Sequence, residues 1–347
     1  MTAVAASQTA MTAVSASQTA MAAVAASSTA MTAVAASQTA MAAVAASSTA
    51  MAAVIANSTA LNAVVSSSTA MTAVAASSTA MTAVAASQTA MAAVAASSTA
   101  MTAVAASQTA MAAVIANDTA LNAVVSSSTA MAAVAASSTA MTAVAASQTA
   151  MAAVAASPTA MAAIWQSSTA VQAVQDNATA WSTFTGASSS VMGKTVAILA
   201  GLDPNSYADM TAVAASQTAM TAVAASSRAM QAVAMAWNTT ESAITGSTVA
   251  MNALKNSGKC QTVSKDVSGA KSVSFITGLC FVFTAEITVS GGACYIEASR
   301  PTGGTTLSLC SSKTAATVNK FCKDPYVKCT NSSHSYASNK LYFYKIS

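Results

Sequence analysis

The sequence predicts an α+β protein, with an elongated shaft of short helical repeats followed by a small β-rich domain. Three observations lead to this fold class. A ten-residue repeat typified by MTAVAASQTA runs through the first 180 residues. Only 6% of the 347 residues are charged, although 54% are hydrophobic. All six cysteines and most of the aromatic residues lie beyond residue 255.

The decads divide the chain into four segments. Eighteen copies follow one another without interruption, and a longer period overlies them, because MAAVIANSTALNAVVSSSTA at 51–70 returns almost unchanged 60 residues later. Tandem similarity of this kind indicates a repeat architecture. The predicted segments are a decapeptide-repeat shaft at 1–180, an irregular joint at 181–209, resumed repeats at 210–255 and a β-rich tip at 256–347.

The distribution of charge limits the classes of function. The first charged residue is Asp118, whereas about a quarter of the residues in an ordinary globular domain are charged. Serine and threonine interrupt every apolar run before it reaches the roughly 20 residues of a membrane span. Lysine and arginine lie beyond residue 250 except for Lys194 and Arg228, without the basic and aromatic interleaving of single-strand binders. We expect a neutral, self-assembling rod that binds no nucleic acid.

Comparison of the copies predicts helices. Placed at about 100° per residue, the variable positions 2, 5, 6 and 8 fall within one arc of a helix. The invariant positions, which include Thr at position 9, fill the remaining arc, and we expect them to be buried. On a strand, variable and invariant positions would mix on one face, so the pattern favours a helix, as does the helix propensity of alanine.

The serine or asparagine at position 7 predicts where each helix begins. Both residue types are good N-caps, because a side-chain oxygen accepts a hydrogen bond from a backbone amide in the first turn. Position 8 holds Pro158 in one copy and Asp118 in another. Proline and acidic residues are both favoured in the first turn of a helix. Each decad is therefore predicted to be one short helix.

Two alternatives to broken helices remain open, namely one overwound continuous helix and a β-type shaft. A continuous helix would rotate its invariant face by roughly 80° per decad, far more than a coiled coil absorbs. A helix of about two turns is not stable alone. It must therefore pack on neighbouring repeats, on neighbouring chains or on both. Across the joint the decads return one residue out of phase, so we expect a local bend or a compensating loop there.

The tip reads as strands separated by Gly, Asn and Ser. Runs rich in Val, Ile, Phe, Tyr and Thr predict five strands, in KSVSFIT, CFVFTAEITVS, ACYIEAS, TTLSLC and KLYFYKIS. A hairpin is expected through Gly291 and Gly292. Disulfides, buried thiols and, less readily, a metal site are open for the six cysteines: Cys260, Cys280, Cys294, Cys310, Cys322 and Cys329.

We expect no enzyme and no cofactor. The acids of the tip are few and scattered, and the single histidine, His334, lies in the loop-like NSSHSYASNK. Binding residues concentrate on loops held by a rigid scaffold. The stretch KDPYVKCTNSSHSYASNK reads as such a loop. The candidate receptor-binding residues are therefore Tyr326, Lys328, His334 and Tyr336.

The decads, their ending in STVAMNALKNS and the Gly/Lys/Tyr-rich tip resemble the shaft and tip of tailed-bacteriophage tail fibres. The resemblance implies a homotrimeric virion appendage, assembled in the host cytoplasm and attached to other virion tail proteins. Its tip would bind a bacterial surface polysaccharide or outer-membrane receptor. The rival classes are an ice-binding rod and a cell-surface adhesin stalk. Burial of Thr at position 9 would argue against ice binding, and an adhesin would need an export signal and an anchor.

Overall fold

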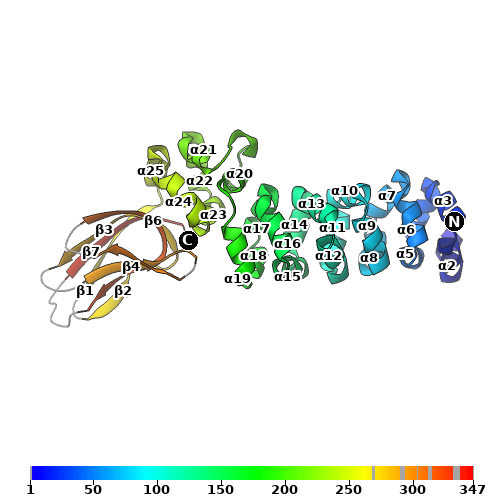
Figure 1. Cartoon of the computed structure of the whole chain (residues 1–347), viewed down its shortest axis with the longest axis horizontal. Coiled ribbons are helices and arrows are strands. Elements are labelled where there is room, and N and C mark those ends of the chain that lie inside the picture. The colour runs from blue at the N-terminus through cyan, green and yellow to red at the C-terminus, as the bar shows by residue number, and fades with distance from the viewer. Residues whose placement is uncertain are drawn as a thin grey trace. The chain divides into compact units, whose positions relative to one another are not determined.

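The computed structural model describes residues 2–267, 270–289, 294–302, 304–311, 315–330 and 337–346. Within these ranges the chain forms 25 α-helices and an antiparallel sheet of seven strands (Figure 1). It divides into two compact units, Met1–Phe184 and Thr185–Ser347. Helical repeats followed by a β-rich domain are therefore confirmed, with the β strands sharing a unit with the last helices.

Each decad of the first unit is one helix of eight or nine residues, apart from the four-residue α1. Helices three apart pack side by side, so three helices make one turn of a solenoid and form three faces. The first face holds α2 (Gln8–Ala16), α5 (Gln38–Ala45), α8 (Ser68–Ala76), α11 (Ser98–Ala106), α14 (Ser128–Ala136) and α17 (Pro158–Gln166). The second holds α3 (Gln18–Ala25), α6 (Ser48–Ile55), α9 (Ser78–Ala85), α12 (Gln108–Ile115), α15 (Ser138–Ala146) and α18 (Ser168–Gln175). The third holds α1 (Thr2–Ala5), α4 (Ser28–Ala35), α7 (Ser58–Val65), α10 (Gln88–Ala96), α13 (Asp118–Ser126) and α16 (Gln148–Ala156), and α19 (Ala178–Thr185) ends the unit.

The residue at position 7 makes each corner. Ser107, for example, has an extended backbone (φ −108°, ψ 118°) between two helices, and its Oγ accepts from the amide of Ala110 at 3.2 Å. Pro158 is the first residue of α17, as expected of a position whose amide has no helical partner. The predicted cap and helix start are confirmed. In five pairs of consecutive helices, the two helices meet at such a break with a bend of 94° to 103°.

The cap serine also ties one turn of the solenoid to the previous one. At two corners its hydroxyl donates to the carbonyl oxygen 32 residues earlier, at 2.5 to 2.7 Å. The donors at the first corner are Ser37, Ser67, Ser97, Ser127 and Ser157. The donors at the second corner are Ser47, Ser77, Ser107, Ser137 and Ser167.

The third corner lacks this ladder in the part of the chain that the structure describes. It holds asparagine at three turns, where Oδ1 of Asn57, Asn117 and Asn177 caps the next helix at 3.0 to 3.1 Å. Between them, Ser87 and Ser147 cap their helices through Oγ at 3.2 Å. Because a turn takes three decads, the 60-residue period in the sequence spans two turns and returns each asparagine to the same corner.

The core of the solenoid lies inside the three faces. Positions 1, 4 and 10 are buried, as in Met81, Val84 and Ala80, and position 5 is mostly buried as well. Near the end of the first unit, larger residues replace the usual ones: Trp165 and Phe184 are fully buried, and their tilted rings pack with centroids 5.1 Å apart. Terminal repeats of solenoids are commonly atypical in this way.

Two expectations about the helix surface are wrong. Thr at position 9 is exposed or half-exposed rather than buried, and the variable position 5 faces the core. Side chains of very different size are buried at position 5, from Ala85 to Trp165. The invariance of Thr at position 9 has no explanation in burial.

The second unit begins with helices that follow the same rule of three, since α20 packs on α23, α21 on α24 and α22 on α25. Their bounds are α20 (Ser189–Leu199), a 3₁₀ turn at Pro204–Ser206, α21 (Met210–Ala215), α22 (Gln217–Ala225), α23 (Ser227–Met235), α24 (Trp237–Thr245) and α25 (Thr248–Lys255). The expected joint therefore contains the end of α19, the whole of α20 and a loop. Gly193 allows close packing of α20, because a Cβ there would lie 2.3 Å from the carbonyl carbon of Asp209.

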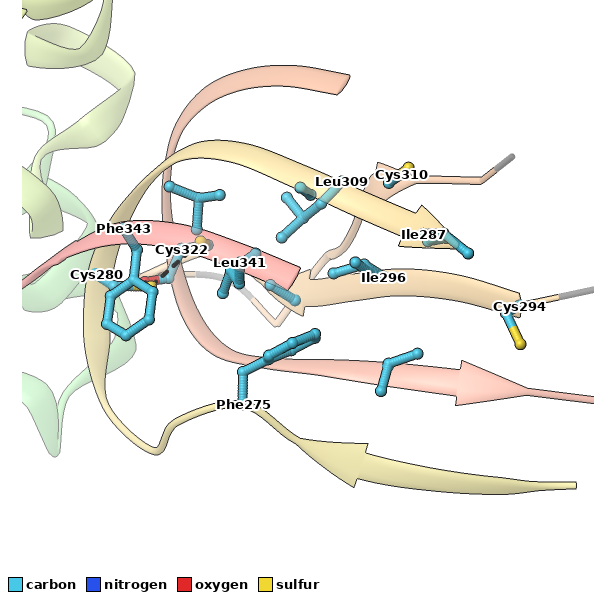
Figure 2. Packing of buried hydrophobic residues seen from close by; sticks show 14 of the residues in the cluster. Phe275, Cys280, Ile287, Cys294, Ile296, Leu309, Cys310, Cys322, Leu341 and Phe343 are labelled. Atoms are coloured by element: carbon cyan, nitrogen blue, oxygen red, sulfur yellow. Dashed lines mark hydrogen bonds between the residues drawn. The ribbon is translucent and has the colours of Figure 1, made fainter. Parts of the chain in front are cut away.

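The sheet has the strand order β1-β7-β3-β6-β4-β5, with β2 also paired to β6. The strands are β1 (Cys260–Val267), β2 (Lys271–Ser274), β3 (Leu279–Val289), β4 (Cys294–Ser299), β5 (Thr306–Cys310), β6 (Ala315–Cys329) and β7 (Ala337–Lys345). Aliphatic, aromatic and cysteine side chains such as Ile296, Leu341 and Phe343 form one cluster inside the bent sheet (Figure 2).

Five of the seven strands lie where the sequence predicts them, and β1 and β6 were not expected. The predicted hairpin between β3 and β4 is wrong, because β6 lies between these two strands and pairs with both. Gly291 and Gly292 themselves lie outside the described residues.

A proline scan tests the helix boundaries. Gln88→Pro places proline at the first residue of α10, after an extended Ser87 (φ −107°, ψ 114°), and should leave stability nearly unchanged. Val84→Pro lies in the buried interior of α9 and should cost about 3 kcal/mol or more. Urea unfolding followed by circular dichroism would compare the two variants. Equal losses would contradict the assigned boundaries.

Paired serine substitutions isolate the ladder between turns. Ser107→Ala removes both a cap and the bond to the carbonyl oxygen of Ala75, whereas Ser87→Ala removes a cap only. Loss of a cap costs about 1 kcal/mol, and a buried hydrogen bond contributes about 1 kcal/mol more. We therefore expect Ser107→Ala to lower the free energy of unfolding about twice as much as Ser87→Ala. An equal loss in the two variants would show that the ladder adds no stability.

Candidate functional site

A buried ion-pair cluster joins the last helices of the second unit to the sheet. Glu241 on α24 is 7% exposed and accepts hydrogen bonds from three donors. Nη1 of Arg300 donates to Oε2 at 2.6 Å, Nζ of Lys320 to Oε1 at 3.0 Å and the amide of Phe321 to Oε2 at 2.9 Å. A buried carboxylate is tolerated when it is paired and hydrogen-bonded in this way.

The indole of Trp237 completes the cluster. The guanidinium of Arg300 lies 3.9 Å from the ring centroid of Trp237, and Nε1 of Trp237 donates to Oγ1 of Thr302 at 3.0 Å. At the neighbouring strand end, the hydroxyl of Tyr344 donates to the carbonyl oxygen of Ala224 at 2.6 Å. These contacts hold the helices against the sheet, and both carboxylate oxygens of Glu241 are occupied by other protein groups. We therefore assign them a structural role.

The sequence-derived receptor candidates are not on one loop. Tyr326 and Lys328 lie within β6, so the expectation that they belong to a loop is wrong. The mistaken reading arose because lysine, aspartate and proline precede them in KDPYVK, a composition typical of turns. His334 and Tyr336 lie outside the described residues.

The second half of β6 brings two further residues beside these candidates. In the pairing of β6 with β4, Lys328 lies opposite Tyr295 and Tyr326 lies opposite Glu297. The hydroxyl of Tyr326 donates to Oε2 of Glu297 at 2.7 Å. This hydrogen bond is the main cause that raises the pKa of the Tyr326 phenol, so the phenol stays protonated and keeps donating.

The receptor candidates chosen from the sequence do not include Tyr295 and Glu297, although the signal for them was present. In CYIEAS, buried Cys294, Ile296 and Ala298 alternate with half-exposed residues. The period of two on a strand therefore places Tyr295 and Glu297 together on the outer face. Because β6 was not predicted as a strand, the sequence did not show that these two residues lie beside Tyr326 and Lys328.

The cysteines fall into three situations. Cys294 and Cys329 form a disulfide between directly opposed positions of β4 and β6. Cys280 and Cys322 are also directly opposed, on β3 and β6, and their buried thiols lie 3.6 Å apart. Their hydrogen bond and burial raise the pKa of Cys280. Cys260 and Cys310 keep thiols as well.

The remaining surfaces of the described residues offer little chemistry. Grooves lie on the solenoid between helices three apart, such as one of about 560 Å³ between α5 and α8. Small uncharged side chains line it, including Gln38, Ala42, Thr69 and Ser77. In the described part of the chain, no three His, Cys, Asp or Glu side chains gather as metal ligands would.

No single described helix is long and apolar enough to cross a bilayer. Five pairs of successive helices reach the required length and composition together, and each pair is bent at its break.

Comparison with known proteins adds no family assignment. No protein-family model matches the chain, and no curated protein matches it either.

Removal of the carboxylate charge from Glu241 should destabilise the second unit. Glu241→Gln keeps the shape of the side chain but leaves Arg300 and Lys320 without their anion, and breaking a buried ion pair typically costs about 3 kcal/mol. Glu286→Gln, at a half-exposed carboxylate on β3, is the control and should change stability by less than about 1 kcal/mol. Urea unfolding of both variants would measure the difference. Similar losses in both would refute the assignment of a structural cluster.

Alkylation and mass spectrometry test the arrangement of the cysteines. In denaturant without reductant, four cysteines should be alkylated, namely Cys260, Cys280, Cys310 and Cys322. After reduction Cys294 and Cys329 should follow. In the native protein Cys280 and Cys322 should react slowly, because both are fully buried. Rapid native labelling of Cys280 would contradict the packing.

Proposed function

We propose that the chain is a structural, non-enzymatic fibre protein in which the solenoid is a spacer and the sheet is the binding part. The observation that carries this proposal is the contrast between the two surfaces. The solenoid presents Ser, Thr, Ala and Gln with almost no charge, and its first charged residue is Asp118. Tyrosine, lysine and glutamate side chains instead gather on the outer side of β4 and β6. Uniform chemistry suits a spacer, and varied chemistry suits recognition.

The geometry of the first unit supports the role of a spacer. Eighteen helices from α2 to α19 at three per turn make six turns. With packed helices about 8 to 10 Å apart, the unit reaches roughly 50 Å. Each added turn repeats the same contacts, so the length can change by whole turns without new chemistry.

Together with the resemblance of its repeats to tail-fibre shafts, this arrangement leads us to propose a virion tail fibre. The sheet would attach the virion to the surface of a bacterial host, and the fibre would join other virion tail proteins. A homotrimer belongs to the same proposal. The solenoid buries its apolar positions within one chain, so its own stability does not require trimerisation.

Adsorption of labelled full-length protein to a panel of bacteria tests the proposed function. We expect saturable binding to a subset of strains. A variant without residues 51–110 loses two whole turns and should bind the same strains with the same affinity. Binding to no strain, or loss of binding with the deletion, would contradict the division of roles. Light scattering of the same sample should give three times the chain mass of 33.8 kDa if the trimer forms.

One observation favours a second function, that of an ice-binding rod. Burial of Thr at position 9 would argue against ice binding, but this residue is exposed or half-exposed along the solenoid, as in Thr79, Thr89 and Thr109. Thermal hysteresis measured with the full-length protein separates the two functions. A tail fibre should produce none, whereas hysteresis that disappears when these threonines are replaced by lysine would establish ice binding.

A further inference from the structure

The outer surface of β2, β6 and β4 carries a group of exposed and half-exposed side chains, which we call the tyrosine face. Its members are Ser274, Tyr295, Glu297, Lys323, Tyr326 and Lys328. Their neighbours along the strands, such as Val273, Ile296 and Val327, belong to or pack against the buried cluster on the opposite side of the sheet. The alternation of a strand therefore points all six outward.

The strand registers arrange these residues in two rows across the sheet. Lys328 and Tyr295 are opposed in one row, and Ser274, Tyr326 and Glu297 are opposed in the next. Tyr295 and Tyr326 are thus diagonal neighbours, whose Cα atoms lie roughly 7 to 8 Å apart. The hydrogen bond from Tyr326 to Glu297 fixes one ring before any ligand arrives. Such preorganisation lowers the entropic cost of binding.

The charges on the tyrosine face select the sign of a ligand. Lys323 and Lys328 are exposed, with a lysine on either side of Tyr326 along β6. Glu297 is the one carboxylate of the group, and it already accepts the hydrogen bond of Tyr326. The face therefore carries two ammonium groups against one carboxylate, and this excess of positive charge complements an anionic ligand.

We propose that the tyrosine face binds an acidic polysaccharide, a proposal that rests on the sheet being the binding part of the chain. Half-exposed phenol rings offer flat apolar surfaces for the C–H faces of sugar rings, while their polar ends stay hydrated. Serine, glutamate and lysine side chains beside them match sugar hydroxyls and carboxylates as hydrogen-bond partners. The two rows run across strands that lie about 4.8 Å apart, so they form an extended surface that suits a chain of sugars.

Binding of full-length protein to polygalacturonate, measured by calorimetry, tests this inference, with neutral dextran and oligo-dT as comparison ligands. We expect binding to polygalacturonate and at least tenfold weaker binding to the other two. Tyr295→Ala and Lys328→Ala should each weaken binding to polygalacturonate at least fivefold. The matched controls are Tyr207→Ala and Lys340→Ala, at a half-exposed tyrosine and an exposed lysine elsewhere in the second unit, which should leave binding unchanged.

Tyr326→Phe separates ring stacking from the position of the ring. This variant keeps the aromatic surface but loses the hydrogen bond to Glu297, so binding should weaken less than in Tyr326→Ala. Near-ultraviolet circular dichroism of each variant shows whether the sheet stays folded. Variants that bind as tightly as the parent, or oligo-dT binding equal to that of polygalacturonate, would overturn the proposal.

The adsorption assay keeps this inference distinct from the proposed function. Protein that adsorbs to bacteria, with adsorption unaffected by Tyr295→Ala and Lys328→Ala, overturns the assigned face and leaves the role in attachment standing. Protein that binds polygalacturonate through the face but adsorbs to no bacterium supports the site and contradicts the role in attachment.

Discussion

The solenoid depends on the two hydrogen bonds made by the serine hydroxyl at position 7. As an acceptor it caps the helix that follows, and as a donor it binds a carbonyl oxygen of the turn below, as Ser107 does with Ala110 and Ala75. The extended backbone at the same residue turns the chain between helices. One residue per decad thus ends a helix and begins the next, and at two of the three corners it also ties successive turns together. Helices of eight or nine residues, unstable alone, become stable because every corner is capped locally and two corners in each turn are bonded to the preceding turn.

The same arrangement explains how the chain manages with so little charge. Ordinary domains use charged side chains on their surface, whereas here exposed Ser, Thr and Gln side chains with exposed alanine cover the three faces. The apolar side chains at positions 1 and 4, such as those of Met81 and Val84, are fully or almost fully buried inside the solenoid. Scarcity of charge favours a rod that assembles from several chains. The solenoid nevertheless buries its apolar positions within one chain.

Periodicity determined how much of the fold could be read from the sequence. The helices, their caps and Pro158 followed from comparing eighteen copies, in which each position shows its constraints repeatedly. Inward and outward positions were assigned less well, because invariance was equated with burial and Thr at position 9 is invariant yet exposed. The sheet has no copies to compare. Its longest strand, β6, was missed because KDPYVK has a composition typical of turns. In the structure the strand continues through this stretch with a positive φ angle of 52° at Asp324.

The interruption at Asp324 also explains how one strand serves two purposes. Before it, Cys322 faces the buried cluster, and the outward-facing Phe321 lies beneath α24 beside Glu241. With regular alternation Tyr326 would face inward like Cys322, since both are even-numbered. The left-handed backbone at Asp324, held by its Oδ1 accepting from the amide of Gly278 at 2.6 Å, reverses the alternation. Val327 then enters the cluster while Tyr326 and Lys328 turn outward. A single irregular residue therefore lets β6 support the helices with its first half and present the tyrosine face with its second.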